Sequence, residues 1–225
     1  MHYNPFTKEY EYVDLGLPSG LLWATMNIGA NSETDYGLYF AWGETTGYPD
    51  ASTKQFSWND YKYSNNGGST AADMTKYNSN DGKTTLDLKD DAARVNIGGN
   101  WIMPNRADFQ ELINNTTNDW VTDYNGSGIN GQLFTSKTDS SKKLFFPAAG
   151  GGIHSSVNNQ GTNGFYWSSS LNRSDTIYSQ SLLFFSGNIY TGNAARYNGL
   201  SIRGVKLSSE KFTPVRELDA YIDRD

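Results

Sequence analysis

Short apolar blocks alternate with polar, glycine-containing stretches in the first third of the chain. The apolar blocks occupy residues 12–15, 21–24 and 38–42, and glycine or proline lies beside each of them. Blocks of this length bounded by turn-forming residues are typical of β-strands. The stretch at 64–83 is rich in Asn, Gly, Ser and Thr, and it predicts an irregular loop rather than a linker between domains.

The middle of the chain changes to a helical period. Asp87 is predicted to cap a first helix in which Leu88, Ala92 and Val95 share one face. A second helix is predicted from Asn105, because Asp108 follows three residues later as in a capping box. Its apolar stripe consists of Phe109, Leu112 and Ile113.

Strand-like blocks return in the last part. Residues 133–136 and 144–146 flank a polar turn at 139–141, and this pattern predicts a hairpin. A glycine-rich run then leads into residues 164–205, which we call the display segment. Strands, then two helices, then many short strands predict the α+β class, within a single domain over residues 1–225.

Composition narrows the range of functions. The chain has 225 residues, a formal net charge of -6 and a pI near 4.9, which argues against nucleic acid as a partner, because phosphate binding needs clustered Lys and Arg. It has 15 Tyr, 23 Gly and no Cys. The first two are favoured in binding loops, and the absence of Cys excludes disulfides and thiolate chemistry.

No segment of the sequence is apolar for long enough to span a membrane, and no signal peptide is recognised at the start of this chain. We therefore expect either that a signal was removed or that the protein reaches the outside by another route, for example within a virion. The predicted location is extracellular, at a cell surface, or on a virion surface if the gene belongs to a phage.

Several motifs resemble one known family over roughly residues 12–205. They are VDLGLPSGLLWA at 13–24, YFAWGE at 39–44, DDAA at 90–93, WIMP at 101–104, FPAAG at 146–150 and YWSSS at 166–170. The family is a paralogous domain of gut-bacterial surface proteins and includes variable proteins of diversity-generating retroelements. The resemblance implies a C-type lectin-like fold of the formylglycine-generating-enzyme subtype, with two helices packed on short, mostly antiparallel strands and long irregular loops.

In such variable proteins a C-terminal segment is rewritten at adenines by error-prone reverse transcription, and the display segment resembles it. Gly204 departs from the pattern, which usually has Pro there. Between anchors at 166–170, 186–188 and 196–199, the resemblance implies a ligand-binding set: Asn172, Arg173, Ser174, Asp175, Thr176, Tyr178, Ser181, Leu183, Phe185, Tyr190, Gly192, Asn193, Ala194, Ala195 and Asn198.

Strand alternation points to some of the same residues. If Leu182 and Phe184 face the core, then Ser181, Leu183 and Phe185 face outward. Beside Tyr178 and Tyr190 they would form an apolar, aromatic patch of the kind that marks contact sites. The alternative is a strand buried on both faces.

Catalytic chemistry has few candidates. Formylglycine-generating enzymes use cysteines, which this chain lacks, and His154 has no second His beside it in its Gly/Ser-rich loop. Asp90 and Asp91 are interpreted as helix-capping residues rather than cation ligands. We expect no catalytic residue, no metal-ligand residue and no cofactor, although a structural Ca²⁺ held by Asp, Asn and backbone oxygens is compatible with the sequence.

The sequence therefore predicts a non-catalytic protein that presents a diversified surface to a protein or glycan on another cell, as in adhesion or phage receptor binding; an oligomer is compatible with it. Two alternatives stay open. One is a structural or adhesive surface subunit without diversification, and the other is a metal-dependent or carbohydrate-active enzyme with a deep, carboxylate-lined pocket. The tail at 206–225 is predicted to contain a short helix from Thr213 that packs on its own domain or docks elsewhere.

Overall fold

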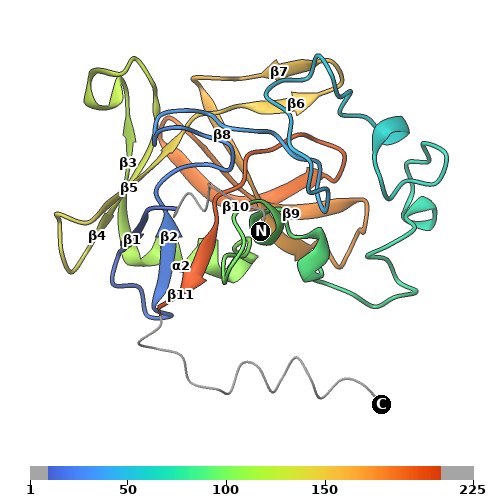
Figure 1. Cartoon of the computed structure of the whole chain (residues 1–225), viewed down its shortest axis with the longest axis horizontal. Coiled ribbons are helices and arrows are strands. Elements are labelled where there is room, and N and C mark those ends of the chain that lie inside the picture. Colours follow the sequence, from blue (N-terminus) through green and yellow to red (C-terminus); the bar gives the residue numbers. More distant parts are fainter. Residues whose placement is uncertain (1–9, 209–225) are drawn as a thin grey trace, which may run out of the picture.

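The computed structural model describes residues 10–208 (Figure 1), so His2 and the helix predicted in the tail lie outside the described residues. Strands make up 36% of the chain and helices 14%, in four small antiparallel sheets. The predicted α+β class is therefore wrong, and the fold is β-rich with few helices. In the described part of the chain, the helical signal yields one helix of more than five residues, α2 (Arg106–Asn115), which has ten.

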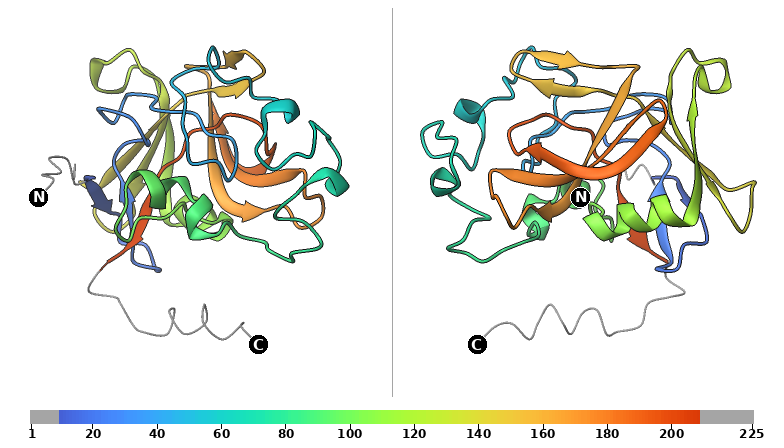
Figure 2. Two further views of the ribbon diagram at one scale, coloured as in Figure 1. Left: turned by 45° about the vertical axis from the view of Figure 1, so that its right-hand side comes forward. Right: turned by 180° about the vertical axis from the view of Figure 1, so that it is seen from behind.

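Three of the sheets form the body around α2 (Figures 1 and 2). One has the order β1 (Tyr12–Asp14), β2 (Leu21–Ala24), β11 (Val205–Leu207), and it brings the two ends of the described chain together. The second contains β3 (Thr116–Val121), β4 (Gly131–Ser136) and β5 (Lys143–Pro147). The pairing of β4 with β5 confirms the predicted hairpin.

The third sheet carries most of the display segment. Its order is β10 (Asn188–Ala195), β9 (Tyr178–Phe185), β8 (Asn163–Leu171), so β9 is central. A smaller ribbon of β6 (Gly151–Ile153) and β7 (Ser156–Asn158) precedes it. Seen from behind, β9 and β10 lie at the front of the molecule above α2 (Figure 2).

The prediction of one continuous helix after Asp87 is wrong. The chain forms a single 3-10 turn, η3 (Leu88–Asp90), and then the short helix α1 (Ala92–Asn96), which is capped by the Asp91 side chain. Leu88 and Val95, predicted to share one helix face with Ala92, belong to separate elements and are 55% and 52% exposed, whereas Ala92 is buried. The other 3-10 turns are η1 (Trp58–Asp60), η2 (Ala71–Asp73) and η4 (Tyr124–Gly126).

The prediction for α2 is confirmed. The Asn105 side chain accepts a hydrogen bond from the Asp108 N–H, and the Asp108 carboxylate accepts one from the Asn105 N–H. This reciprocal cap satisfies N–H groups that the first helical turn leaves without partners. Phe109 and Leu112 are fully buried, so the predicted apolar stripe faces the core.

The block at 38–42, predicted to be a strand, joins no sheet, although residues 39–42 are buried. Phe40 makes an isolated antiparallel bridge with Leu200, and two indoles attach the block to β8. Trp42 Nε1 donates to the Ser168 carbonyl (2.8 Å) and Trp167 Nε1 donates to the Phe40 carbonyl (2.7 Å). Two buried indole donors are thus satisfied by backbone acceptors, and they tie the N-terminal third to the display segment.

The core has two adjoining parts. One is built around Trp42, Trp167 and Tyr77, and the other around Trp23, Phe109 and Phe184. The sheet of β8, β9 and β10 supplies side chains to both parts. Each face of that sheet is therefore partly covered by the core. Only the side chains outside the covered areas are exposed and available for binding.

Candidate ligand-binding surface

The inner face of the sheet formed by β8, β9 and β10 belongs to the core. Leu182 and Phe184 are 0% exposed, as predicted, and they pack in the same cluster as Phe109 of α2. Gly164 pairs with Phe184 across the strands, and a Cβ at position 164 would lie 2.0 Å from the Phe184 ring. A side chain larger than hydrogen would therefore displace that ring.

The outer face carries a row of apolar side chains. Leu183 pairs with Phe165 on one side and with Tyr190 on the other, so these three side chains lie next to one another across the sheet. Leu183, Phe165 and the neighbouring Phe185 are half-buried, and Tyr190 is 47% exposed. We call these four residues the outer row. They form the outward patch that the alternation of β9 predicts, at Leu183, Phe185 and Tyr190.

Two members of the predicted patch lie elsewhere. Ser181 is on the outer side of β9 but is 0% exposed, because it pairs with the buried Trp167 where the first part of the core covers the sheet. Tyr178 alternates with Leu182, so its side chain belongs to the opposite face of β9 from the outer row. Neither residue extends the outer row.

The loop between β8 and β9 holds the next group of predicted residues. Arg173, Ser174 and Asp175 are exposed, whereas Asn172 and Thr176 are half-buried. Main-chain bonds close the loop: Asn172 N–H donates to the Tyr178 carbonyl (3.2 Å) and Tyr178 N–H to that of Asp175 (3.1 Å). The loop therefore presents its polar side chains from a hydrogen-bonded frame.

The remaining predicted residues follow β10 and its end. Asn193 is exposed, and Gly192, Ala194, Ala195 and Asn198 are half-buried. The Asn198 Oδ1 atom is buried without a hydrogen-bond partner among the described residues. Of these residues, Gly192 adjoins the outer row, because a Cβ there would approach both Leu183 and Tyr190, whereas Asn193 and Ala195 lie on the opposite face of β10.

A shallow groove of about 900 Å³ adjoins this loop. One wall is the face of α2 from Arg106 to Asn114, and the other is the loop with Asn172, Arg173 and Ser174. The Arg106 N–H donates to the Ser170 hydroxyl (3.0 Å), which connects the start of α2 to the end of β8. The resemblance did not imply the α2 residues of this groove, because they lie about 60 positions before the loop in the sequence.

One buried arginine holds the base of the display segment. Arg196 is 0% exposed, and its guanidinium lies over the Trp42 ring with 4.9 Å between its Cζ atom and the ring centroid. It donates to the Tyr61 hydroxyl (2.9 Å) and to the carbonyls of Thr176 (2.9 Å), Lys76 (2.9 Å) and Tyr77 (3.2 Å). Arg196 therefore connects the end of β10 to the loop before β9 and to the backbone at residues 76–77.

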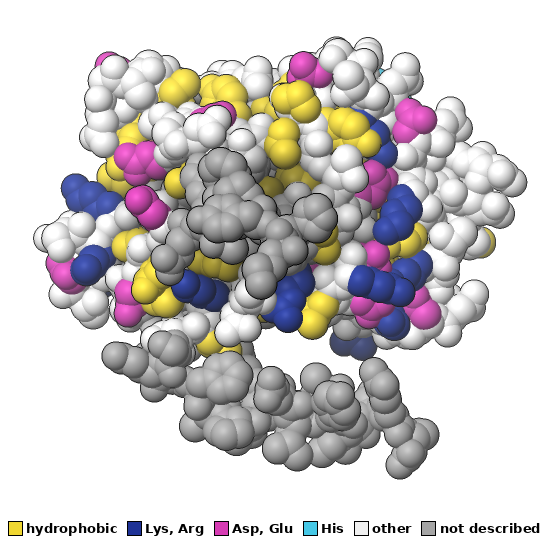
Figure 3. All heavy atoms as spheres, viewed as in Figure 1, with side chains coloured by type: hydrophobic (Ala, Val, Ile, Leu, Met, Phe, Trp, Pro, Cys, Tyr) yellow, Lys and Arg dark blue, Asp and Glu magenta, His cyan; other side chains and the backbone are white. Residues whose placement is uncertain are grey.

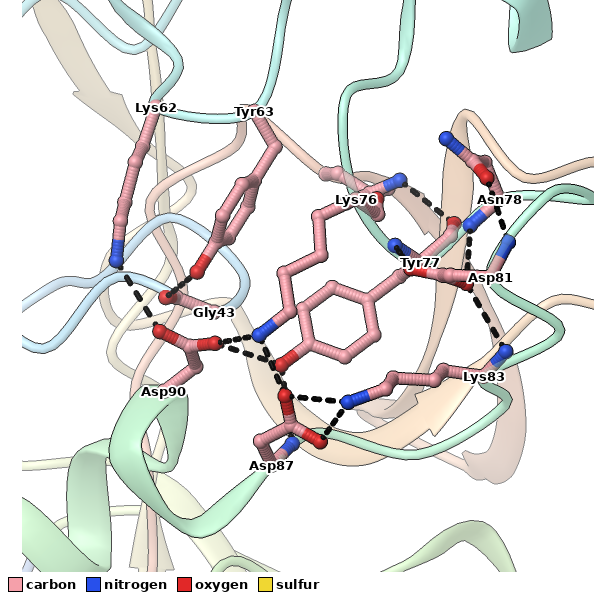
Figure 4. A network of polar contacts seen from close by, with 11 residues as sticks. Gly43, Lys62, Tyr63, Lys76, Tyr77, Asn78, Asp81, Lys83, Asp87 and Asp90 are labelled. Carbon is pink, nitrogen blue, oxygen red and sulfur yellow. Dashed lines mark hydrogen bonds and ion pairs between the residues drawn. The ribbon is translucent and has the colours of Figure 1, made fainter. Parts of the chain in front are cut away.

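Beside Arg196, a polar network of Lys and Asp side chains holds the polar segment at 62–90 (Figure 4). Asp90 is 3% exposed and accepts hydrogen bonds from Lys76, from the Tyr77 hydroxyl (2.7 Å) and from Lys62 (3.2 Å). Asp87 accepts from Lys76 (2.6 Å) and from Lys83 (2.7 Å). Because these carboxylates are paired with cations, the network is suited to holding a loop rather than to proton transfer.

The pKa directions agree with that assignment. Burial alone would raise the pKa of Asp90, but the hydrogen bonds from Lys76, Tyr77 and Lys62 outweigh it and hold the pKa well below its usual range. Burial raises the pKa of Asp91, whose carboxylate accepts hydrogen bonds from the N–H groups of Arg94 (2.9 Å) and Met103 (2.8 Å). Asp90 and Asp91 thus have separate structural contacts and do not converge on one site.

Replacing Asp90 with Asn is expected to lower the free energy of unfolding by about 3 kcal/mol at pH 7, because it removes the buried charge that pairs with the half-buried Lys76. The folded pKa of Asp90 is depressed, so its stabilisation is fully present above the unfolded pKa of about 3.9 and is lost as pH falls through the folded pKa. Urea unfolding at pH 7, 4 and 3 should show the difference from wild type shrinking at the lowest pH. The exposed Asp119 gives a matched control, Asp119→Asn, and equal losses in both variants would contradict the assignment.

The histidine and the carboxylates considered as catalytic candidates lie apart from one another in the described chain. Within residues 10–208, no three His, Asp or Glu side chains come together in a way that could hold a metal ion. The Glu44 carboxylate pairs with Lys54 (2.7 Å), and His154 lies exposed on a loop. The groove contains one carboxylate, that of Glu111, instead of the converging pair that the enzyme alternative predicts.

The surface charge is mixed. On the face shown in Figure 3, Lys and Arg side chains lie among Asp and Glu rather than gathering into a basic patch. No helix in the described part of the chain is long and apolar enough to cross a membrane. Comparison with family models, with curated proteins and with solved structures gives no match for this chain.

Proposed function

We propose that this protein is a non-catalytic binding protein whose display segment presents the outer row and the loop at 172–176 to a protein or glycan on another cell. The observation that carries the proposal is the outer row. Four neighbouring apolar side chains on one sheet face stay partly exposed, while the opposite face of the same strands is sealed in the core. Partly exposed aromatic groups on a rigid frame are typical of contact sites.

Preorganisation supports this proposal. The outer row lies on paired strands, and the loop at 172–176, at the other end of β9, is closed by main-chain hydrogen bonds and by Arg196. Residues already held in place lose little conformational freedom on binding, so more of the contact free energy appears as affinity. Tyr190 adds a large contact area at low entropic cost, and the neighbouring Asn and Ser side chains supply adaptable hydrogen bonds.

We further propose that the segment is diversified, as its resemblance to variable proteins of diversity-generating retroelements implies. The structure separates the positions that tolerate change from those that do not. Exposed positions such as Arg173, Asp175 and Asn193 contact solvent, whereas Trp167 and Phe184 are 0% exposed in the core. Substitutions at the first group cost little stability, and substitutions at the second cost several kcal/mol.

The DNA flanking the gene tests this proposal. We expect a second, non-coding copy of the sequence that encodes residues 164–205, with mismatches confined to adenines of that copy. The mismatches should fall in codons of exposed or half-buried residues, such as Arg173, Leu183 and Tyr190, and should spare those of Trp167 and Phe184. Absence of the copy would contradict diversification and leave a fixed adhesive subunit, and mismatches in the core codons would contradict the assigned binding face.

A further inference from the structure

We propose that the groove between α2 and the loop of residues 172–174 binds an acidic saccharide, with Arg106 and Arg173 holding the sugar carboxylate. This inference rests on the proposed binding function and extends its surface beyond the display segment. Both arginines line the groove, one from each wall, and both are exposed. Two guanidinium groups facing one groove match the planar, two-oxygen geometry of a carboxylate.

Neither arginine is neutralised within residues 10–208. Arg106 Nε donates to the Thr191 hydroxyl (3.3 Å), which leaves its terminal nitrogens free, and neither Arg106 nor Arg173 forms an ion pair with a described carboxylate. By contrast, the Lys side chains of the network around Asp90 are paired. The two free cations therefore lie in the same groove of a protein whose net charge is -6.

The acidic side chains near the groove face other partners. The Glu111 carboxylate accepts hydrogen bonds from the Ser19 N–H (2.8 Å) and hydroxyl (2.6 Å), on the side of α2 toward β2. The Asp108 carboxylate caps the Asn105 N–H (2.8 Å). In the loop, Asp175 accepts a hydrogen bond from the Ile177 N–H (3.3 Å) and does not line the groove. The local balance inside the groove is thus positive and selects an anion.

The rest of the lining favours a sugar over a peptide. Amide side chains contribute from both walls, at Gln110, Asn172 and Gln180, and Thr85 and Ser174 add hydroxyls. Such groups both donate and accept hydrogen bonds, as sugar hydroxyls do. Most protein and peptide interfaces centre on apolar or aromatic anchors, and here the apolar lining is Ala107 and Leu171, of which Leu171 is 5% exposed. The groove therefore lacks a deep apolar subsite for a peptide side chain.

Titration of the full chain with defined saccharides tests the inference. The probes are sialyllactose and tetragalacturonate, and the matched neutral controls are lactose and the methyl-esterified tetragalacturonate. We expect at least one acidic probe to bind in calorimetry at 0.15 M salt and its neutral control to bind at least tenfold more weakly. Affinity should fall at least tenfold in Arg106→Gln and in Arg173→Gln and stay unchanged in Lys89→Gln, which removes an exposed cation outside the groove lining.

Three outcomes would overturn the inference: no binding of either acidic probe, equal binding of acidic and neutral forms, or binding that both arginine variants retain. Tighter binding of a tetraglutamate peptide than of either saccharide, lost in the same variants, would assign the groove to acidic peptides instead. These failures are distinguishable from failure of the proposed function, because the flanking-DNA test and the outer row do not depend on Arg106.

Discussion

Replacing Arg196 with Met is expected to lower the free energy of unfolding by about 4 kcal/mol. The guanidinium is completely buried and donates to one hydroxyl and to three backbone carbonyls, all within 3.2 Å. Methionine fills a similar volume but cannot donate, so buried acceptors at residues 76, 77 and 176 lose their partner. Each buried acceptor left unsatisfied costs about 1–3 kcal/mol.

The alternative expectation is a neutral or stabilising change, since some buried ion pairs can be replaced by apolar residues without loss. That argument applies where both charged partners are removed together. Around Arg196 the acceptors are main-chain carbonyls, which no substitution at position 196 removes. Because these carbonyls would stay buried without a donor, we expect the substitution to lower the free energy of unfolding. Loss of the cation–π contact with Trp42 adds to this loss.

Urea unfolding of wild type, Arg196→Met and the exposed-site control Arg106→Met measures this effect. Hydrogen exchange provides a second readout: amides of the loop at 172–177 should exchange faster in Arg196→Met, because the Thr176 carbonyl loses its donor. Amides of β2, which Arg196 does not contact, should exchange at rates that follow only the global change in stability. A loss below 1 kcal/mol, or equal losses in the two variants, would contradict the role assigned to Arg196.

The sequence predicted the local features well. The hairpin of β4 and β5, the capping box of α2 and the inward direction of Leu182 and Phe184 are all set by residues close together in the chain. Short-range periodicity and capping chemistry are sufficient to find such features. The short helix α1 was overestimated, because the apolar spacing of Leu88 and Val95 resembles a helical face although both side chains face solvent.

The long-range features could not be predicted from pattern. Ser181 has the alternation of an outward residue, and its burial depends on which part of the core covers that end of β9. The groove joins α2 to a loop about 60 residues later in the chain, and its α2 residues look like an ordinary polar helix face. The resemblance marks residues 196–199 as an anchor, but the complete burial of the Arg196 and Arg203 side chains does not follow from the sequence pattern, because arginine is usually exposed.

Arg196 and Arg203 stabilise different parts of the core. Arg196 joins the display segment to the polar segment at 62–90, in the part of the core around Trp42. Arg203 lies in the other part, where its guanidinium stacks over the Phe146 ring with 4.3 Å between its Cζ atom and the ring centroid. The proposed display surface would need such fixed points, because residues selected for contact cannot also be selected for packing.

Replacing Arg203 with Met is expected to cost about 4 kcal/mol, with no effect confined to the loop at 172–177. Arg203 is 0% exposed and donates to the carbonyls of Ala24 (3.0 Å) and Phe145 (3.1 Å) and to Asn27 Oδ1 (3.0 Å). It thereby joins β2 to β5, and the carbonyls stay buried without a donor in the variant. Burial lowers the pKa of Arg203 to about 10, so the group still carries its charge at neutral pH.

The Arg203→Lys variant separates the role of the charge from that of the hydrogen bonds, because lysine keeps the positive charge but lacks the planar guanidinium. The three acceptors come from separate segments, and a single ammonium on a flexible stem cannot place donors as the rigid guanidinium does. Urea unfolding should therefore rank wild type above Arg203→Lys, with Arg203→Met and Arg203→Lys both at least 2 kcal/mol less stable. Full stability of Arg203→Lys would show that charge alone is sufficient at this position, and full stability of Arg203→Met would show that the bonds to β2 and β5 contribute nothing.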